Sequence, residues 1–102
     1  MLLVIAQVKA KPGQSEALLH ALKTYIDVVK ANEPGTLYFN VHQKALDGFD
    51  SLESYVILEG YADAAAYALH QASAYKPEHI GRIREHVLEA SAEQFLRADP
   101  GS

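Results

Sequence analysis

The sequence contains no cysteine, which excludes disulfide bonds, thiolate catalysis and metal sites with cysteine ligands. It also lacks any run of 18 apolar residues, and no basic leader precedes the apolar residues near its start. Basic residues are outnumbered, with nine Lys and Arg against 13 Asp and Glu, so nucleic acids and anionic membranes are unfavourable partners. We therefore expect a soluble protein of the cytoplasm.

The composition is that of an ordinary globular domain, with 49% hydrophobic and 22% charged residues in a chain of 102 residues. A chain of this length buries only about 60–65% of its unfolded surface, so the core is thin and dimerisation would stabilise it. We divide the chain into one domain, residues 1–97, and a flexible polar tail, residues 98–102, which carries no packing residues.

Alternating apolar and polar residues predict four strands. In the first strand, Gln7 shares a face with apolar residues and needs a hydrogen-bond partner if it is buried. In the second, Tyr38, Asn40 and His42 form a polar face that either meets water or lines a cavity. The four predicted strands are Leu2 to Ala10, Thr36 to Gln43, Glu53 to Tyr61 and Glu89 to Arg97.

Apolar residues with a period of 3.6 predict a first helix from about residue 14 or 15 to residue 31. Asn32, in a left-handed conformation, and Pro34, which cannot continue a helix, are expected to end it. A second helix is predicted at the alanine run behind Asp63, because the carboxylate of Asp63 suits the N-cap position.

Two further segments complete the order of elements. A short helical segment is predicted within residues 74–88, where Pro77 fits an early helical position, and residues 44–51 predict a loop or a wide hairpin turn. The resulting order is typical of an α+β, ferredoxin-like split βαβ fold, with a four-stranded antiparallel sheet and helices on one face. The other face would be bare and apolar, and pairing two sheets into a dimeric α/β barrel would hide it.

Side chains on the second predicted helix favour a small-molecule site. Tyr67, His70 and Gln71 share one side of this helix, and Tyr61 ends the preceding strand, so these residues are expected to form one wall of a pocket. The alternatives are structural: a hydrogen bond from His70 that ties helix to sheet, and core packing by the tyrosines. The sequence contains no HxH or HExxH pair, phosphate-binding glycine loop or dinucleotide fingerprint, so we expect no metal, nucleotide or NAD chemistry.

A set of short motifs resembles a known family. Pro34-Gly35 opens an alternating strand with His42 near its end, and the segment EGYAD, residues 59–63, leads into a helix with His70 and Ser73. This pattern is similar to the antibiotic biosynthesis monooxygenase domain, a dimeric α/β-barrel group that includes quinol monooxygenases and haem-degrading monooxygenases. The resemblance extends from Leu2 to about Arg97.

The sequence departs from the family pattern at three positions. Tyr61 stands where the family often has tryptophan, and Tyr75 stands where many members have a second histidine. Gln7 aligns near the first-strand asparagine of the haem-degrading branch, whose tryptophan is absent because this chain contains no Trp. These differences weaken the haem interpretation.

The resemblance implies oxygenation without a cofactor, in which a deprotonated aromatic substrate passes one electron to dioxygen. His70 matches the helix histidine of the family and is the first candidate for the catalytic base, because the ordinary histidine pKa of about 6.5 suits proton removal near neutral pH. His79 is the second candidate, with an exposed surface position as the alternative. The predicted substrate-binding residues are Gln7, Asn40, His42, Tyr61, Tyr67 and Tyr75, with Gln7 and Asn40 as donors to an oxyanion.

The implied partners are a small aromatic molecule, O2 and a second copy of the chain. Glu59, which belongs to the motif, is expected to pair with a basic residue across the dimer rather than to act as a base. Two other functions stay open: a non-enzymatic dimeric module that binds a small molecule, and a haem-binding or haem-degrading protein.

Overall fold

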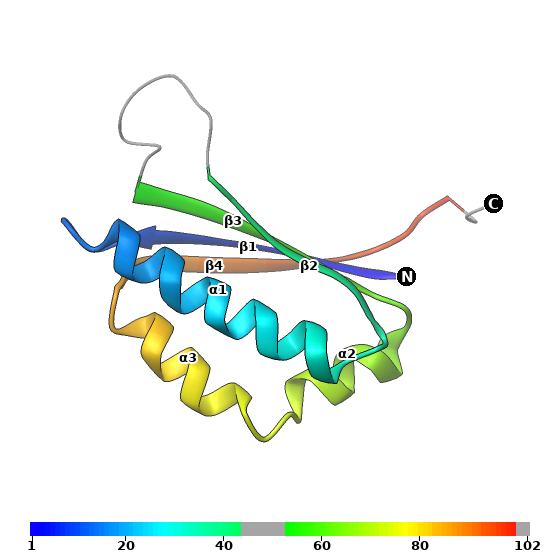
Figure 1. Cartoon of the computed structure of the whole chain (residues 1–102). Coiled ribbons are helices and arrows are strands. Elements are labelled where there is room, and N and C mark those ends of the chain that lie inside the picture. Colours follow the sequence, from blue (N-terminus) through cyan, green and yellow to red (C-terminus); the bar gives the residue numbers. More distant parts are fainter. Residues whose placement is uncertain (44–52, 100–102) are drawn as a thin grey trace.

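The computed structural model describes residues 1–43 and 53–99, and within them it shows the predicted α+β ferredoxin-like fold (Figure 1). The strands form one antiparallel sheet in the order β2-β3-β1-β4, and the helices lie together on one of its faces. The predicted loop at residues 44–51 lies outside the described residues. In chain order the elements are β1 (Leu2–Ala10), α1 (Ser15–Asn32), β2 (Thr36–Gln43), β3 (Ser54–Tyr61), α2 (Ala64–Gln71), α3 (Lys76–Arg84) and β4 (Val87–Leu96).

The end of α1 differs from the prediction. Asn32 is the last helical residue, and no residue other than glycine has a positive φ within the described ranges, so the predicted left-handed Asn32 is wrong. Glu33 instead leaves the helix with φ −126° and ψ 84°. The cause is Pro34, because a proline disfavours the helical conformation in the residue before it. This fixes the backbone of Glu33 at the end of α1.

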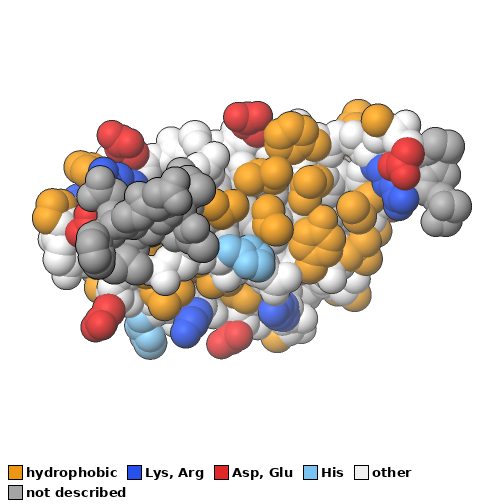
Figure 2. Space-filling model, turned by 90° about the horizontal axis from the view of Figure 1, so that it is seen from above, with side chains coloured by type: hydrophobic (Ala, Val, Ile, Leu, Met, Phe, Trp, Pro, Cys, Tyr) orange, Lys and Arg blue, Asp and Glu red, His pale blue; other side chains and the backbone are white. Residues whose placement is uncertain are grey.

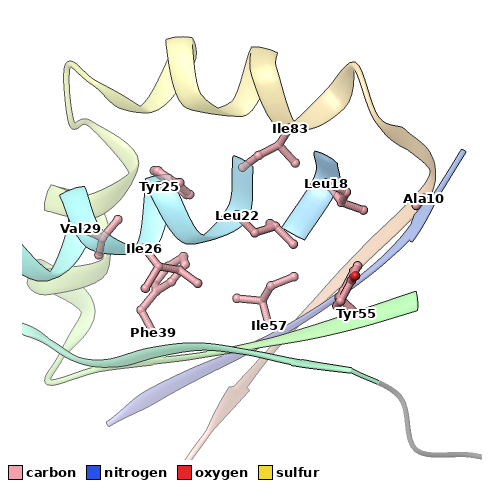
Figure 3. Packing of buried hydrophobic residues seen from close by; sticks show 10 residues of the cluster. All are labelled: Ala10, Leu18, Leu22, Tyr25, Ile26, Val29, Phe39, Tyr55, Ile57 and Ile83. Carbon is pink, nitrogen blue, oxygen red and sulfur yellow. The ribbon is translucent and has the colours of Figure 1, made fainter. Parts of the chain in front are cut away.

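The core lies between the sheet and the helices (Figure 3). Side chains from one stripe of α1 point towards β2 and β3, and Ile83 of α3 closes the layer from the other side. The apolar side chains that recur every 3.6 residues along α1 therefore pack in one layer against those that recur every two residues along the strands. The cluster consists of Ala10, Leu18, Leu22, Tyr25, Ile26, Val29, Phe39, Tyr55, Ile57 and Ile83.

The short helix α2 packs closely on the turn between α1 and β2. Its predicted N-cap is confirmed, because an Asp63 side-chain oxygen accepts from the backbone N–H of Ala66 at 2.8 Å. A Cβ at Gly35 would lie 2.8 Å from the Cβ of Ala66. A glycine in the turn and an alanine in the helix thus allow α2 to reach the end of α1.

The opposite face of the sheet carries many apolar side chains (Figure 2). Strand alternation and register place Leu3 and Ile5 of β1 beside Val56 and Leu58 of β3 on this face. The ring of Tyr38 lies across Gly60, where a Cβ would come within 2.3 Å of it. Among the described residues, no helix is long and apolar enough to cross a membrane.

Candidate active site

A buried cluster of polar and aromatic side chains lies where α1 ends against α2 and α3, and His70 is at its centre. His70 is 3% exposed. Its Nδ1 lies 2.9 Å from Oε1 and 3.2 Å from Oε2 of Glu33, and its Nε2 lies 3.3 Å from the hydroxyl of Tyr25. The imidazole of His70 therefore joins α2 to Tyr25 within α1 and to Glu33 in the turn that follows α1. Its contacts with the sheet are the Glu59 carboxylate, 4.0 Å from Nε2, and the rings of Phe39 and Tyr61.

The carboxylate of Glu33 collects hydrogen bonds from several elements. The Thr36 hydroxyl donates to Oε1 at 2.9 Å, the Tyr75 hydroxyl donates to Oε2, and the Ser73 hydroxyl lies 3.4 Å from Oε2. An ionised carboxylate only accepts, so Nδ1 of His70 carries the hydrogen of the bond to Glu33. Nε2 of the neutral ring then carries the lone pair, and it accepts from the hydroxyl of Tyr25 at 3.3 Å.

A second carboxylate approaches His70 from the sheet. Glu59 lies on the helix-facing side of β3, with Oε1 at 4.0 Å from Nε2 of His70. The same oxygen accepts from the hydroxyl of Tyr61 at 2.5 Å, within the range of short charge-assisted bonds. The imidazole thus lies between two carboxylates that come from different layers of the fold.

Burial shifts the pKa values of four groups of the cluster towards their neutral forms. It lowers the pKa of His70, and the neighbouring Glu33 carboxylate opposes this change. It raises the pKa of Glu59, while the hydrogen bond from Tyr61 and the charge of Lys76 act in the other direction. Burial also raises the pKa values of Tyr25 and Tyr61. A neutral imidazole that can accept a proton is the expected state of His70 near neutral pH.

Aromatic rings enclose the imidazole of His70. The ring centroids of Tyr61 and Phe39 lie 5.3 and 5.5 Å from that of His70. The His79 ring stacks on Tyr25, with centroids 5.5 Å apart and an interplanar angle of 27°. The cluster therefore combines one base with apolar and aromatic surfaces, which suits the removal of a proton from a substrate shielded from water.

The structure brings together most of the residues that the sequence predicted for this site. His70, His79, Tyr61 and Tyr75 lie in the cluster, and His79 is buried. Tyr67 lies at its edge, with its ring centroid 5.0 Å from that of Tyr61. Their catalytic and binding roles stay predictions.

Three predicted residues lie elsewhere. Gln7 and His42 are exposed on the face of the sheet that points away from the helices, where both pair with Val56. Asn40 is exposed on the edge strand β2, and its side-chain oxygen accepts from Nζ of Lys30 at 3.3 Å. In this chain, these residues are therefore separated from His70 by the sheet or lie at its edge.

The sequence did not single out Glu33 and Tyr25 as site residues. Tyr25 lies on the apolar stripe of α1, so its spacing predicts core packing, and its hydroxyl gives no further signal. Glu33 falls in the helix-ending segment before Pro34, where an acidic residue is usually solvated. The one available signal was that Pro34 fixes the backbone of Glu33, and this does not identify its partner 37 residues later.

Two cavities border the cluster. One, of about 300 Å³, lies between the turn after α1 and α2, and is lined by Glu33, Gly35 and Leu69 among others. The other, of about 540 Å³, is lined by Leu2, Tyr67, Gln94 and Leu96 among others. Within residues 1–43 and 53–99, no group of three or more His, Asp or Glu side chains is placed to hold a metal ion.

The family model of the antibiotic biosynthesis monooxygenases matches residues 1–91 of this chain. The chain belongs to the antibiotic biosynthesis monooxygenase family. The match includes β1, both long-range partners Glu33 and His70, and the helices that cover the sheet. No curated protein matches the sequence.

Solved structures share the fold of this family member over nearly its whole length. An antibiotic biosynthesis monooxygenase superposes with a TM-score of 0.80 at 22% identity, covering 96% of this chain and 99% of that chain. A protein from Caulobacter crescentus, provisionally named an antibiotic biosynthesis monooxygenase, gives a TM-score of 0.85 at 21% identity, covering 96% and 90%. A protein from Pseudomonas aeruginosa gives 0.78 at 25% identity, covering 94% and 92%.

Proposed function

We propose that this chain is a cofactor-independent monooxygenase that oxidises a small electron-rich aromatic substrate, such as a quinol, a phenol or a polyketide-type phenol, with O2. Membership of the family supports an oxidoreductase of the monooxygenase type. The observation that carries the proposal is the arrangement of His70, with Nδ1 held by the Glu33 carboxylate and with a lone pair on Nε2 that can take a proton once a substrate displaces the Tyr25 hydroxyl.

In the proposed reaction, Nε2 of His70 removes a proton from a substrate hydroxyl group. The Glu33 carboxylate stabilises the imidazolium that forms, much as an oriented carboxylate does for other catalytic histidines. The substrate anion then gives one electron to O2, and the resulting radical pair combines. One oxygen atom enters the product and the other leaves as water, and all the electrons come from the substrate.

We propose that the substrate enters from the larger cavity, whose lining meets the edge of the cluster at Tyr67. Its volume of about 540 Å³ lies within the usual range for small-molecule sites. The hydroxyl of Tyr67 accepts from the side-chain amides of Gln71 at 2.9 Å and Gln94 at 3.2 Å, so its own hydrogen is available to a substrate oxygen. Since His70 is 3% exposed, the substrate reaches it by displacing side chains between the cavity and the imidazole.

Oxygen consumption by the metal-stripped protein tests the proposal, with a panel of freshly reduced quinols and phenols and a no-protein control for autoxidation. We expect uptake above autoxidation, and a decrease of roughly 10²–10⁴-fold in His70→Ala. The matched control is His20→Ala, which removes an exposed histidine of α1. The proposal is wrong if no substrate gives uptake above autoxidation, or if both variants behave alike.

A small-molecule-binding module without catalysis is the second candidate function. It is favoured by the 3% exposure of His70, whose surroundings are filled by the protein's own side chains. In that case, the same aromatic compounds would bind to the protein, as measured by calorimetry, without oxygen uptake.

We also propose that the partner of this chain is a second copy, docked through the apolar face of the sheet. Leu3, Ile5, Val56 and Leu58 form its centre. A two-fold arrangement would place like apolar residues against each other and remove them from water.

A further inference from the structure

Tyr61 is the most deeply buried tyrosine of the cluster and is bound to a base. Its exposed fraction is 0%, and its hydroxyl donates to Oε1 of Glu59 at 2.5 Å. The Glu59 side chain is itself only 12% exposed. Hydrogen bonds of this length between a hydroxyl group and a carboxylate are among the strongest in proteins.

A second tyrosine connects Tyr61 to the surface. The rings of Tyr61 and Tyr67 meet edge to face, with centroids 5.0 Å apart and an interplanar angle of 66°. Tyr67 is partly exposed and lines the cavity of about 540 Å³. An electron therefore has a direct aromatic path between the cavity and the interior, through two rings in contact.

A phenol loses an electron most easily when a base takes its proton at the same time, because no charged phenol radical then forms in a buried place. We propose that Tyr61 is a redox-active tyrosine that gives one electron, through Tyr67, to a one-electron oxidant in the cavity while its proton moves to Glu59. The oxidant, an organic radical or an oxidised metal complex, is reduced by one electron. The products in the protein are a neutral phenoxyl radical and a carboxylic acid.

Tyr75 also donates to a carboxylate, but its position is less suitable. Glu33 accepts from Thr36 and His70 as well, so its two oxygens are shared among several donors and are not held by one tyrosine. Burial raises the pKa of Glu59, so this carboxylate holds a proton more readily. Tyr55, another buried tyrosine, donates to the backbone oxygen of Ser15, which is a weak base.

The test is flash-quench oxidation of the whole protein with a soluble ruthenium(III) polypyridyl complex, followed by electron paramagnetic resonance of the trapped radical. This measurement requires no oxygenase activity, so it is independent of the proposed function. We expect one dominant tyrosyl signal, which is lost in Tyr61→Phe and forms more slowly in Tyr67→Phe. The matched control is Tyr38→Phe, because Tyr38 is partly buried on the other face of the sheet and is expected to leave the signal unchanged.

Glu59→Gln provides a second test that keeps Tyr61 in place. The amide still accepts a hydrogen bond but cannot take the proton, so most of the long-lived radical is expected to be lost. Circular dichroism identifies any variant that does not fold. If either Tyr61→Phe or Glu59→Gln fails to fold, the radical signal of the remaining one tests the proposal. The proposal is overturned if a folded Tyr61→Phe or Glu59→Gln variant keeps the wild-type signal, or if Tyr75→Phe is the variant that removes it.

Discussion

The chemistry of the candidate site depends on which of its residues hold protons. Burial lowers the pKa of His70 and raises that of Glu59, because both charged forms lose hydration. Glu33 accepts hydrogen bonds from Thr36, Tyr75 and His70. His70 is thus available as a proton acceptor over a wider pH range than a free histidine.

Stability is expected to depend on pH through His70. Below about pH 6.5, the ordinary histidine pKa, the unfolded chain takes up a proton that the folded chain binds less readily. The unfolded state then binds more protons, so the free energy of unfolding decreases as the pH falls from that value to the lowered folded pKa. Urea unfolding at about pH 8 and about pH 5.5 measures this change.

The control for this prediction is His70→Gln. Glu59 acts in the opposite direction, because its raised pKa lets the folded chain take up a proton more readily as the pH falls. Since the variant keeps Glu59, the difference between wild type and variant isolates His70. An equal pH dependence in the two proteins would contradict the prediction.

Replacing the Glu33 carboxylate is expected to destabilise the fold. In Glu33→Gln, one carboxylate oxygen becomes an NH2 group. Depending on the orientation of the amide, this group faces either the Tyr75 hydroxyl or the donors of His70 and Thr36. Buried donors without an acceptor cost about 1–3 kcal/mol, and urea unfolding measures the loss. Glu85→Gln, at an exposed position, should change stability by less than about 0.5 kcal/mol.

At the scale of elements, α2 is a short helix whose position determines that of His70. Its buried residue is His70 itself, and the helix is held at one end by the Asp63 cap. Its contact with the turn after α1 depends on Gly35, which leaves no room for a side chain beside Ala66. The geometry of the site therefore depends on two of the smallest residues in the chain.

We expect Gly35→Ala to destabilise the protein by about 1–3 kcal/mol, because the new methyl group overpacks against Ala66 and shifts α2. Ala66→Gly alone should cost about 1 kcal/mol, as glycine does within a helix. Combining the two changes removes the clash, so the double variant should lose less stability than the sum of the single losses. Urea unfolding of the four proteins completes this cycle, and strict additivity would show that the contact is unimportant.

At the scale of the whole molecule, the two faces of the sheet differ in cover. The helices bury one face, and the other presents apolar side chains to solvent (Figures 1 and 2). An isolated chain with such a face would tend to associate. The proposed dimer would remove this surface from water and leave the His70 cluster under its own helices.

The oligomeric state in solution tests the proposed dimer. We expect light scattering to give twice the chain mass at micromolar concentration, and Leu58→Lys to shift the protein to a monomer by placing a charge in the centre of the sheet face. Leu69→Lys is the control, because Leu69 is 69% exposed on α2, away from this face. A monomeric wild-type protein, or equal masses for the two variants, would count against the dimer.

Much of the fold was predictable from the sequence, because strand alternation and helical periodicity are local signals. The bounds of β1 and β2 agree with the prediction. Strand β4 begins at Val87, two residues before the predicted start at Glu89. The site was less predictable. The pairing of Glu33 with His70 joins residues far apart in the chain, and it depends on the packing of α2 against the end of α1.

The distribution of the tyrosines has a practical consequence. The chain contains six tyrosines and no tryptophan, so its intrinsic fluorescence arises from tyrosine alone. Four of the six belong to the His70 cluster or its edge: Tyr25, Tyr61, Tyr67 and Tyr75. A ligand that enters the site is therefore expected to change the absorption and emission of these tyrosines, so its binding can be followed without an added probe.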